Sequence, residues 1–370
     1  MFKKKNIVLI LSLFVMILFT ACESDVGKIE DESGTNDEKM VLVEGEETDE
    51  AEETEEDVDP KEKIDLSLKP NEAGQAMVLM YHNIGEEEEE WTRTPENFKN
   101  DLKNLYDRGY RAVRLEDYVK NTMDVEAGMT PVVITFDDGN ENNFKVIQDE
   151  KGEDIIDPDS AVGILEEFKK EYPDFNTTAT FYVFGENMFR QPEHLEYKLK
   201  YLVDNGYDIG NHTLDHRSMK KADGSEYVQE GIAKQVELIN DVIADYDVNT
   251  YALAYGERPD SEELTDLLAK GEYDDVIYEN IAILNVGWNP TESPIHAEFN
   301  PLSIPRIRAS EMKVDNVGMY NWMDFLDDNP SKRYISDGVK EVITVPKSLE
   351  DTIDQEKVGD SELYIYEDEQ

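Results

Sequence analysis

Two short segments of the chain carry residues whose types and spacing suit metal-assisted hydrolysis. Residues 132–139 read VVITFDDG, an apolar run that ends in two carboxylates and a glycine. Residues 211–216 read NHTLDH and place His212 and His216 four positions apart. Two imidazoles and one carboxylate form a divalent-metal site that keeps positions open for water and substrate. The second carboxylate is then a candidate general base, so the two segments predict a metal-assisted hydrolase.

Each segment also has a plainer interpretation. Asp-Asp-Gly is a common composition for a surface turn, and two histidines at this spacing can form a hydrogen-bonded pair in a core. However, the chain has only five histidines, and these two come just after a predicted short strand that ends at Ile209 and Gly210. Four-residue spacing puts both imidazoles on one face of a helix or of a compact turn. We therefore expect a zinc site, with cobalt, nickel or iron as alternatives.

The elements around these segments alternate between strands and helices. Met77–His82 and Val132–Phe136 are continuous apolar runs, which are typical of strands buried on both faces of a parallel sheet. Pro95–Gly109 predicts a helix with Thr94 as its N-cap. In parallel α/β folds, functional groups collect at the carboxyl ends of the strands. Gly139 allows the chain to turn there, so that two adjacent aspartates can share one site.

The same alternation continues to about residue 310. Further strands are predicted at Ala179–Phe184, Tyr207–Gly210, Tyr251–Tyr255, Ala282–Val286 and Ser303–Arg308, and further helices at Ser160–Tyr172, Glu193–Asn205, Glu226–Tyr246 and Ser261–Leu268. About seven parallel strands favour an α/β fold with a closed or nearly closed (β/α) barrel, and a doubly wound open sheet is the alternative. We place the catalytic domain at residues 73–310 and treat 311–370 as a C-terminal extension with one strand, Val342–Val345.

The composition excludes one class of partner. The 370 residues include 86 acidic and 36 basic ones, which gives a formal net charge of −50. Such a chain offers little to neutralise phosphates, so we expect no nucleic acid partner. A surface adapted to salt or alkali would explain the charge, and so would attraction to cationic, glucosamine-rich polymers. A hydrophobic content of 39% is enough for one packed domain, and we expect a monomer.

The first 22 residues have the composition of a targeting segment. Lysines at positions 3–5 precede the apolar run Ile7–Phe19, and LFTAC at positions 18–22 resembles the lipobox of a bacterial lipoprotein signal peptide. Cys22, the only cysteine, would then carry the lipid that anchors the protein to the extracytoplasmic face of the cell membrane. An ordinary signal peptide or an uncleaved anchor is the alternative.

Residues 23–72 have the composition of a tether. They contain 21 acidic and 5 basic residues and no aromatic residue. Such a segment buries too little apolar surface to offset its ordering entropy, so it is predicted to be disordered. We expect it to hold the folded domain away from the membrane.

Five separated segments together resemble one known family. TFDDG at 135–139 and HTLDH at 212–216 are similar to motifs of the polysaccharide deacetylase family, carbohydrate esterase family 4. YHNI at 81–84, PENF at 95–98 and GYR at 109–111 resemble the branch that deacetylates poly-N-acetylglucosamine and related surface glycans. The resemblance runs from about residue 77 to about residue 310.

The resemblance implies a role for each residue of the two main motifs. Asp138, His212 and His216 would bind the metal, and Asp137 would be the general base. The metal and a backbone N–H would stabilise the oxyanion that forms on the acetyl carbonyl. The leaving nitrogen needs an acid, and His82 is our candidate because it ends the first strand at the same edge of the sheet.

The sequence departs from the family pattern around the base. The family commonly has Arg-Pro-x-Tyr-Gly, in which the arginine orients the catalytic aspartate. Residues 252–256 read ALAYG and keep only Tyr255 and Gly256, which we assign to substrate or oxyanion contacts. Arg306 is the candidate to replace the missing arginine or to contact substrate, and a structural salt bridge is the alternative. The family's late leucine-rich segment that ends in histidine is also absent.

The resemblance implies a metal-dependent hydrolase that removes N-acetyl groups from an N-acetylglucosamine-containing cell-surface polysaccharide or from peptidoglycan. An O-acetyl polysaccharide esterase is a close alternative. The missing arginine motivates a second one, a glycan-binding lipoprotein with weak or no catalysis. A glycoside hydrolase fits poorly, because its two carboxyls lie about 5–9.5 Å apart on different strands, whereas Asp137 and Asp138 are adjacent.

Overall fold

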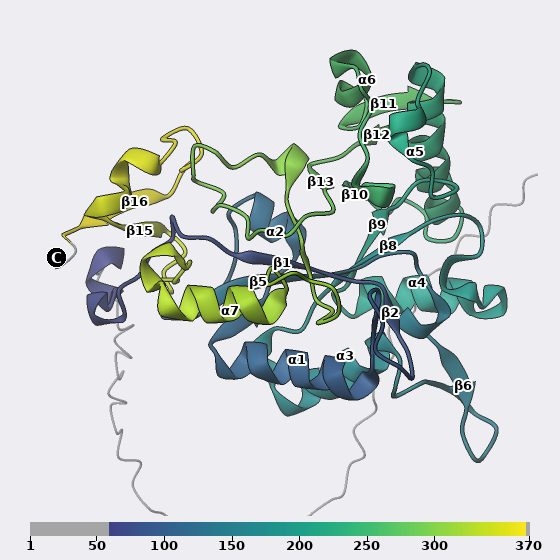
Figure 1. Cartoon of the computed structure of the whole chain (residues 1–370), viewed down its shortest axis with the longest axis horizontal. Helices are drawn as coiled ribbons and strands as arrows, with labels where there is room; N and C mark the ends of the chain where they lie inside the picture. Colours follow the sequence, from purple (N-terminus) through teal and green to yellow (C-terminus); the bar gives the residue numbers. More distant parts are fainter. Residues whose placement is uncertain (1–58, 368–370) are drawn as a thin grey trace, which may run out of the picture. The chain divides into compact units, whose positions relative to one another are not determined.

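The computed structural model describes residues 59–367, which form an α/β fold around one curled parallel sheet (Figure 1). The strand order is β13-β10-β9-β8-β5-β1-β14, and β4 pairs with the first half of β5. The bounds are β1 Met77–Tyr81, β4 Tyr110–Ala112, β5 Thr130–Phe136, β8 Thr180–Val183, β9 Asp208–Asn211, β10 Thr250–Ala252, β13 Ala282–Leu284 and β14 Ile307–Arg308. The prediction of about seven parallel strands is confirmed, and the sheet curls into a half-barrel.

Strands β1 and β5 are neighbours in the sheet, and every residue in them is buried. Their side chains alternate between two hydrophobic cores, as the two-residue period of a strand requires. Leu79 and Ile134, which pair in register, join the core that also contains Phe98 of the outer helices. Val78 and Val133 join the second core, on the other face. Burial on both faces explains why these strands read as unbroken apolar runs.

Helices cover the sheet at the positions that the apolar periodicity predicts. In the first, α1, the Thr94 side chain caps the helix by accepting the Asn97 N–H at 3.2 Å, and the chain leaves the helix through Gly109 at φ +78°. Figure 1 shows α1 and α3 side by side on one side of the sheet. The bounds are α1 Pro95–Asp107, α2 Leu115–Val119, α3 Ala161–Glu171, α4 Leu195–Asp204, α5 Ser225–Asn240, α6 Glu262–Asp266 and α7 Met319–Asp328.

One short segment contacts two strands that are far apart in the strand order, β13 and β1. The Ile304 N–H donates to the Ile283 carbonyl at 3.0 Å, and Leu284 and Ile304 form a parallel bridge. Three residues later, Ile307 of β14 pairs with Leu79 of β1. The predicted strand Ser303–Arg308 is therefore a bridge followed by a two-residue strand. The residues between Ile304 and Ile307 therefore cross from β13 to β1.

Short strand pairs outside the main sheet were not predicted. They are β2 Asn83–Ile84 with β3 Thr92–Arg93, β6 Val146–Gln148 with β7 Asp154–Ile156, and β11 Lys270–Tyr273 with β12 Val276–Glu279. Each strand has two to four residues, which is too short for a clear alternating pattern. β4 was missed for the same reason.

Residues 59–72 of the predicted tether belong to the folded part. Pro60–Lys63 and Leu66–Leu68 form 3₁₀ turns, and Glu72 is buried. The Glu72 carboxylate accepts the Thr344 N–H at 2.9 Å, which ties this segment to β15 (Val342–Pro346). The predicted disorder of the tether does not extend through these residues, which form turns and end in the buried residues Pro70, Asn71 and Glu72.

The C-terminal extension is part of the same folded unit. Helix α7 inserts Met319, Met323 and Leu326 into the main core. The predicted strand near residue 342 is present as β15 Val342–Pro346, and it pairs in parallel with β16 Glu362–Tyr366. The boundary predicted at residue 310 therefore does not mark the end of the core.

The predicted leader at residues 1–22, with Cys22, lies outside the described residues. Within residues 59–367, no helix has both the length and the apolar character that crossing a membrane requires.

Candidate active site

The two aspartates lie at the carboxyl end of β5, where the chain turns. The Asp137 N–H still donates to the Tyr81 carbonyl at 3.0 Å and so continues the ladder with β1. Asp138 and Gly139 then adopt φ values of +76° and +54°. A Cβ at Gly139 would lie 2.9 Å from a methyl of Val183, so both the φ angle and the space favour glycine. This turn brings two adjacent carboxylates to one site, as predicted.

The two histidines follow β9 in a compact turn, not in a helix. The buried Asn211 side chain accepts the Thr213 N–H at 2.8 Å and donates to the Ile232 carbonyl at 2.9 Å, which fixes the start of the turn. Thr213 and His216 have φ values of +70° and +54°. The two imidazole rings end with their centroids 4.8 Å apart. Positive φ angles in side-chain-bearing residues are strained, and such strain is concentrated at functional sites.

Asp138, His212 and His216 form a possible metal site. The Asp138 Oδ1 atom lies 3.6 Å from His212 Nε2 and 3.4 Å from His216 Nε2, and one ligand atom from each residue lies within 4.8 Å of the others. The His212 Nδ1 atom lies 2.7 Å from the Ala252 carbonyl, which fixes the proton on Nδ1 and directs Nε2 at the site. Two imidazole nitrogens and one carboxylate oxygen are a donor set that fits zinc and similar divalent ions.

Asp137 lies beside this site and is held by Arg306. Two guanidinium nitrogens of Arg306 donate to the two carboxylate oxygens of Asp137, both at 2.7 Å. Arg306 also donates to the Asn285 carbonyl at 2.9 Å and to the Thr135 hydroxyl at 3.2 Å. Because Arg306 is fully buried and these contacts occupy it, it positions Asp137 and does not reach substrate. The structure thus places an arginine where the family pattern requires one, although Ala252 stands in the usual position.

Electrostatics set the charge states of the central groups. Burial would raise the pKa of Asp137, but the guanidinium of Arg306 outweighs it and holds that pKa well below the ordinary range. Burial would lower the pKa of His212, but the neighbouring carboxylates of Asp138 and Asp137 raise it. Burial lowers the pKa of His82 more than the two aspartates raise it. At neutral pH, Asp137 is therefore a charged acceptor next to the possible metal site.

His82 also lies next to Asp137. Its Nε2 atom is 4.0 Å from Asp137 Oδ2, and its ring packs against the Trp91 ring with centroids 4.7 Å apart. The Asn143 side chain donates to the His82 carbonyl at 2.5 Å and so connects this residue to the loop after β5. Sequence reasoning did not single out Asn143 or Trp91. The only feature of the sequence that could have indicated these two residues is their position in loops that follow strands of the sheet.

Tyr255 and Gly256 lie after β10, close to the histidines. Tyr255 is exposed, and its ring centroid is 4.6 Å from that of His216. The Gly256 N–H donates to the Leu253 carbonyl at 3.0 Å, so this amide already has an acceptor. Gly256 has φ +67°, and a Cβ there would lie 2.8 Å from Val286. The loop thus brings Tyr255 to the rim of the site.

The remaining two histidines lie elsewhere. His194 precedes α4 as its N-cap residue. The His296 Nδ1 atom accepts the Glu298 N–H at 3.1 Å, and His296 forms a β-bridge with Ile353. His296 is therefore not positioned as the acid, which leaves His82 as the histidine placed beside Asp137.

A parallel α/β fold with two histidines and one carboxylate next to a clamped, ionised aspartate has the parts of a hydrolase. A family model for polysaccharide deacetylases matches residues 124–271, which contain both motifs. This part of the chain is therefore similar to polysaccharide deacetylases. The match does not include His82 or Arg306, so their places at the site come from the structure alone.

Individual proteins are similar to this chain over part of its length. YxkH of Bacillus subtilis (strain 168), whose name assigns it to the polysaccharide deacetylases, is 25% identical over 151 residues. These residues are 40% of this chain and 46% of YxkH, so this chain matches about half of that relative.

Solved structures give similar results. The Streptococcus pyogenes deacetylase PplD, solved in complex with acetate, has 16% identity and a TM-score of 0.49 over 68% of this chain and 97% of its own. A Bacillus anthracis protein, also assigned by its name to the polysaccharide deacetylases, has 20% identity and a TM-score of 0.48 over 63% of this chain and 64% of its own.

Proposed function

We propose that this protein is a metal-dependent hydrolase that removes N-acetyl groups from a polysaccharide containing N-acetylglucosamine. One observation carries the proposal. The ligand atoms of Asp138, His212 and His216 lie within 4.8 Å of one another, next to an aspartate that Arg306 holds through two hydrogen bonds. The alternative of a glycan-binding protein with weak or no catalysis rested on the missing arginine. Arg306, which contacts Asp137, removes this reason for it.

Asp137 is the base in this proposal. A divalent metal held by Asp138, His212 and His216, which we take to be zinc, would polarise the acetyl carbonyl and make water a better nucleophile. Asp137 would orient the attacking water and accept its proton. Arg306 keeps the Asp137 carboxylate ionised and in one orientation, so no rearrangement is needed as the reaction proceeds.

His82 is the proposed acid for the leaving nitrogen. Its Nε2 atom lies 4.0 Å from Asp137, and its side chain is 17% exposed, so that it can meet a substrate. Once the amide carbon has been attacked, the glucosamine nitrogen must gain a proton before the C–N bond breaks. Because burial lowers the pKa of His82, His82 would first have to take up the proton that Asp137 accepts from water, and it would then pass this proton to the nitrogen. The Trp91 ring and the Asn143 hydrogen bond to the His82 backbone hold His82 in place for this step.

The setting of the reaction is also a proposal. The YHNI, PENF and GYR segments favour poly-N-acetylglucosamine or a related surface glycan as substrate, with peptidoglycan as the next candidate. Lipid attachment at Cys22 would hold the protein on the extracytoplasmic face of a bacterial membrane, and we expect a monomer. Mass spectrometry of the protein from the membrane fraction, compared with Cys22→Ala, tests the anchor. Release of both forms into the medium would contradict it.

Acetate release tests the activity. The purified full chain is loaded with zinc and incubated with chitooligosaccharides, poly-N-acetylglucosamine and peptidoglycan, and acetate is measured. We expect release from at least one polymer, and loss of this release in Asp137→Asn. The proposal fails if the loaded protein releases no acetate from any of them. Parallel measurements on acetylated xylan distinguish an amide hydrolase from an O-acetyl esterase, and chromatography of the polymer detects any chain cleavage.

A further inference from the structure

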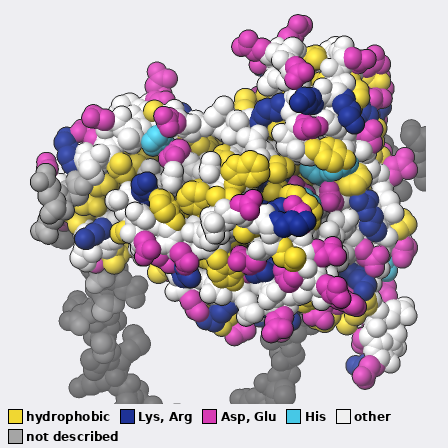
Figure 2. Space-filling model, in the orientation of Figure 1, with side chains coloured by type: hydrophobic (Ala, Val, Ile, Leu, Met, Phe, Trp, Pro, Cys, Tyr) yellow, Lys and Arg dark blue, Asp and Glu magenta, His cyan; other side chains and the backbone are white. Residues whose placement is uncertain are grey.

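Four acidic residues are buried in the part of the chain that the structure describes: Glu72, Asp101, Asp137 and Asp337. Figure 2 shows Asp and Glu side chains spread over much of the visible face, in contact with solvent. A buried carboxylate is costly unless donors pair with it. Asp137 is the proposed base, and Glu72 and Asp337 both contact Thr344 of β15. The fourth, Asp101, is fully buried on α1, so we asked what its carboxylate holds in place.

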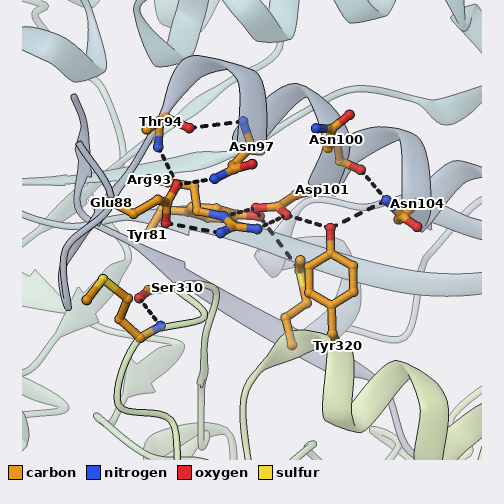
Figure 3. Close-up of polar contacts among 12 residues, drawn as sticks. Tyr81, Glu88, Arg93, Thr94, Asn97, Asn100, Asp101, Asn104, Ser310 and Tyr320 are labelled. Carbon is orange, nitrogen blue, oxygen red and sulfur yellow. Dashed lines mark hydrogen bonds and ion pairs between the residues drawn. The ribbon is translucent and has the colours of Figure 1, made fainter. Parts of the chain in front are cut away.

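Asp101 is the centre of a polar network (Figure 3). The Arg93 Nε–H donates to its carboxylate at 2.7 Å, and a second nitrogen of Arg93 makes a shorter contact with the same group. The Tyr320 hydroxyl donates to it at 2.9 Å and the Tyr81 hydroxyl at 3.2 Å. These donors come from β3, α7 and β1. One carboxylate on α1 therefore joins three other elements, and we call these four residues the Asp101 network.

The network reaches His82, the proposed acid, from two directions. Tyr81 is the residue directly before His82. Arg93 lies two residues after Trp91, whose ring forms a wall against the His82 ring, with centroids 4.7 Å apart. The Asn83 N–H donates to the Trp91 carbonyl at 3.0 Å, so the residue after His82 is also tied to this segment. The backbone on both sides of His82 and the ring against it are thus connected to the same carboxylate.

A second carboxylate fixes the loop that carries Trp91. Glu88 accepts the Thr94 N–H at 2.7 Å and the Asn97 side-chain amide at 2.6 Å, and it also contacts Arg93 at 3.1 Å (Figure 3). Thr94 and Asn97 belong to the first turn of α1, the helix that carries Asp101. The wall beside His82 is therefore fixed by the protein itself and does not need substrate to order it.

The base and the metal site depend on other contacts. Asp137 is held by Arg306 through two hydrogen bonds of 2.7 Å. The His212 ring is oriented by the Ala252 carbonyl at 2.7 Å. Weakening the Asp101 network should therefore disturb the acid first, and leave the groups that activate water in place.

Amides and activated esters differ in how much they need the acid. The nitrogen of an amide must gain a proton before the C–N bond breaks, whereas p-nitrophenolate leaves from p-nitrophenyl acetate without a proton. Both reactions need the metal, the attacking water and the base. A misplacement of about 1 Å in a catalytic group can cost about 10²-fold in rate. A poorly held acid should therefore slow amide hydrolysis much more than ester hydrolysis.

We propose that the Asp101 network positions His82, and that it thereby sets the preference of this site for amides over esters. The inference rests on the proposed function, in which His82 is the acid for the leaving nitrogen. Asp101 is fully buried and is a positioning residue, which acts through Tyr81 and Arg93. The network thus determines which acetyl linkage the site hydrolyses.

Asp101→Asn tests the network, because it removes the charge that pairs with Arg93 and keeps the size of the side chain. Asp337→Asn is the matched control. Asp337 is also buried, at 4% exposed, but it accepts the Thr344 hydroxyl of β15 at 2.6 Å. Tyr320→Phe is a milder second variant, which removes one hydrogen bond to Asp101 and leaves the Arg93 pair. It decides the question if Asp101→Asn folds poorly.

Two rates are compared on the zinc-loaded full chain: acetate release from the polymer that the parent deacetylates fastest, and hydrolysis of p-nitrophenyl acetate. We expect Asp101→Asn to lower kcat for acetate release about 30-fold, with KM and ester hydrolysis changed less than about threefold. Tyr320→Phe should shift the ratio of the two rates in the same direction, by about threefold. Asp337→Asn should leave the ratio unchanged. An equal loss for both substrates in Asp101→Asn, or an unchanged ratio in Tyr320→Phe, would refute the proposal.

Hydrogen exchange measured by mass spectrometry tests the hold on His82 without turnover. The Asn83 N–H donates to the Trp91 carbonyl at 3.0 Å, and the Gly85 N–H donates to the Arg93 carbonyl at 2.9 Å. Both amides therefore report whether β2 and β3 stay paired after His82. Asp101→Asn should speed exchange at both amides about tenfold, whereas Asp337→Asn should not.

These measurements separate the inference from the proposed function. If the parent released acetate and the ratio of rates were unchanged in Asp101→Asn, the function would stand and the positioning role would be refuted. If the parent released no acetate, the function and the preference for amides would both fail. Faster exchange in Asp101→Asn would then leave the hold on His82 standing, and unchanged exchange would refute it as well.

Discussion

Replacing Arg306 with methionine tests the contact on which the proposed base depends. The Arg306 and Asp137 side chains are 0% and 2% exposed, and two bonds of 2.7 Å join them. Removing the arginine leaves a buried carboxylate without a partner, which costs about 3–5 kcal/mol. The Asn285 carbonyl also loses its donor, at about 1 kcal/mol. We therefore expect the free energy of unfolding to fall by about 5 kcal/mol, and acetate release to fall about 10²-fold because Asp137 is no longer oriented.

Urea unfolding of the full chain measures the first effect. A chelator should be present, so that metal binding to the folded state does not contribute. Arg258→Met is the matched control. Arg258 is partly buried and donates to the Asn285 side chain at 2.8 Å and to the Leu302 carbonyl at 2.7 Å, without a carboxylate partner among the described residues. The loss of Arg258 removes only hydrogen bonds to neutral acceptors, and it should cost about 1–2 kcal/mol.

The double variant Arg306→Met/Asp137→Asn separates the ion pair from packing. Each single change leaves one buried charge alone, whereas the double change removes both charges. The double variant should therefore be more stable than the sum of the single effects predicts, by about 2 kcal/mol or more. If Arg306→Met lost no more stability than Arg258→Met, the buried pair would not hold this region together. If it lost stability but kept its rate of acetate release, the orienting role would be wrong.

Three further changes test the metal site, a buried acid and the turn after β5. His212→Ala should lose bound zinc, whereas His296→Ala, away from the site, should keep it; elemental analysis of the purified proteins decides, and zinc retained in His212→Ala would contradict the ligand assignment. Burial raises the pKa of Glu72 from 4.5 to about 8, so the folded state holds this proton more tightly than the unfolded chain does. The contribution of Glu72 to the free energy of unfolding is therefore complete below pH 4.5 and is lost as the pH rises to about 8. Glu72→Gln stays neutral, so its free energy of unfolding should match that of the parent near pH 4.5 and exceed it by up to about 4 kcal/mol at pH 9. If the parent and Glu72→Gln were equally stable at pH 9, the raised pKa of Glu72 would be refuted. Gly139→Ala meets a positive φ and a methyl of Val183 at 2.9 Å, so it should cost about 1–3 kcal/mol in urea unfolding and weaken zinc binding, and unchanged stability would show that the turn tolerates a side chain.

The part of the fold that the sequence predicts is the part that burial dictates. β1 and β5 are buried on both faces, so their residues are apolar without interruption and their positions can be read directly. Helix α1 is equally readable because its cap, its first proline and its closing glycine occur in order. The Asp-Asp-Gly and His-x-x-x-His spacings are local, so Asp137, Asp138, His212 and His216 could be grouped before the fold was known.

What the sequence does not predict depends on contacts between distant segments. Glu72 resembles the other acidic residues of the tether, and only the position of Thr344 makes it a buried residue. Trp91 lies in a charged loop, and its role as a wall follows from Arg93 and Asp101, whose pairing has no pattern along the chain. Short strands such as β2 and β3 give no periodic signal of their own.

Arg306 shows why a missing motif residue does not by itself indicate that a protein has lost its function. The family pattern has its arginine at the end of β10, where this chain has Ala252. In a curled sheet, the loops at the strand ends surround one small space, so a side chain from another segment can reach the same carboxylate. Arg306 lies between the Ile304 bridge to β13 and the first residue of β14, and from there both of its terminal nitrogens meet Asp137. The physical requirement is a buried guanidinium with two donors on the proposed base, and in this chain Arg306 meets it. We therefore expect Arg306→Met to impair catalysis, although the natural Ala252 does not.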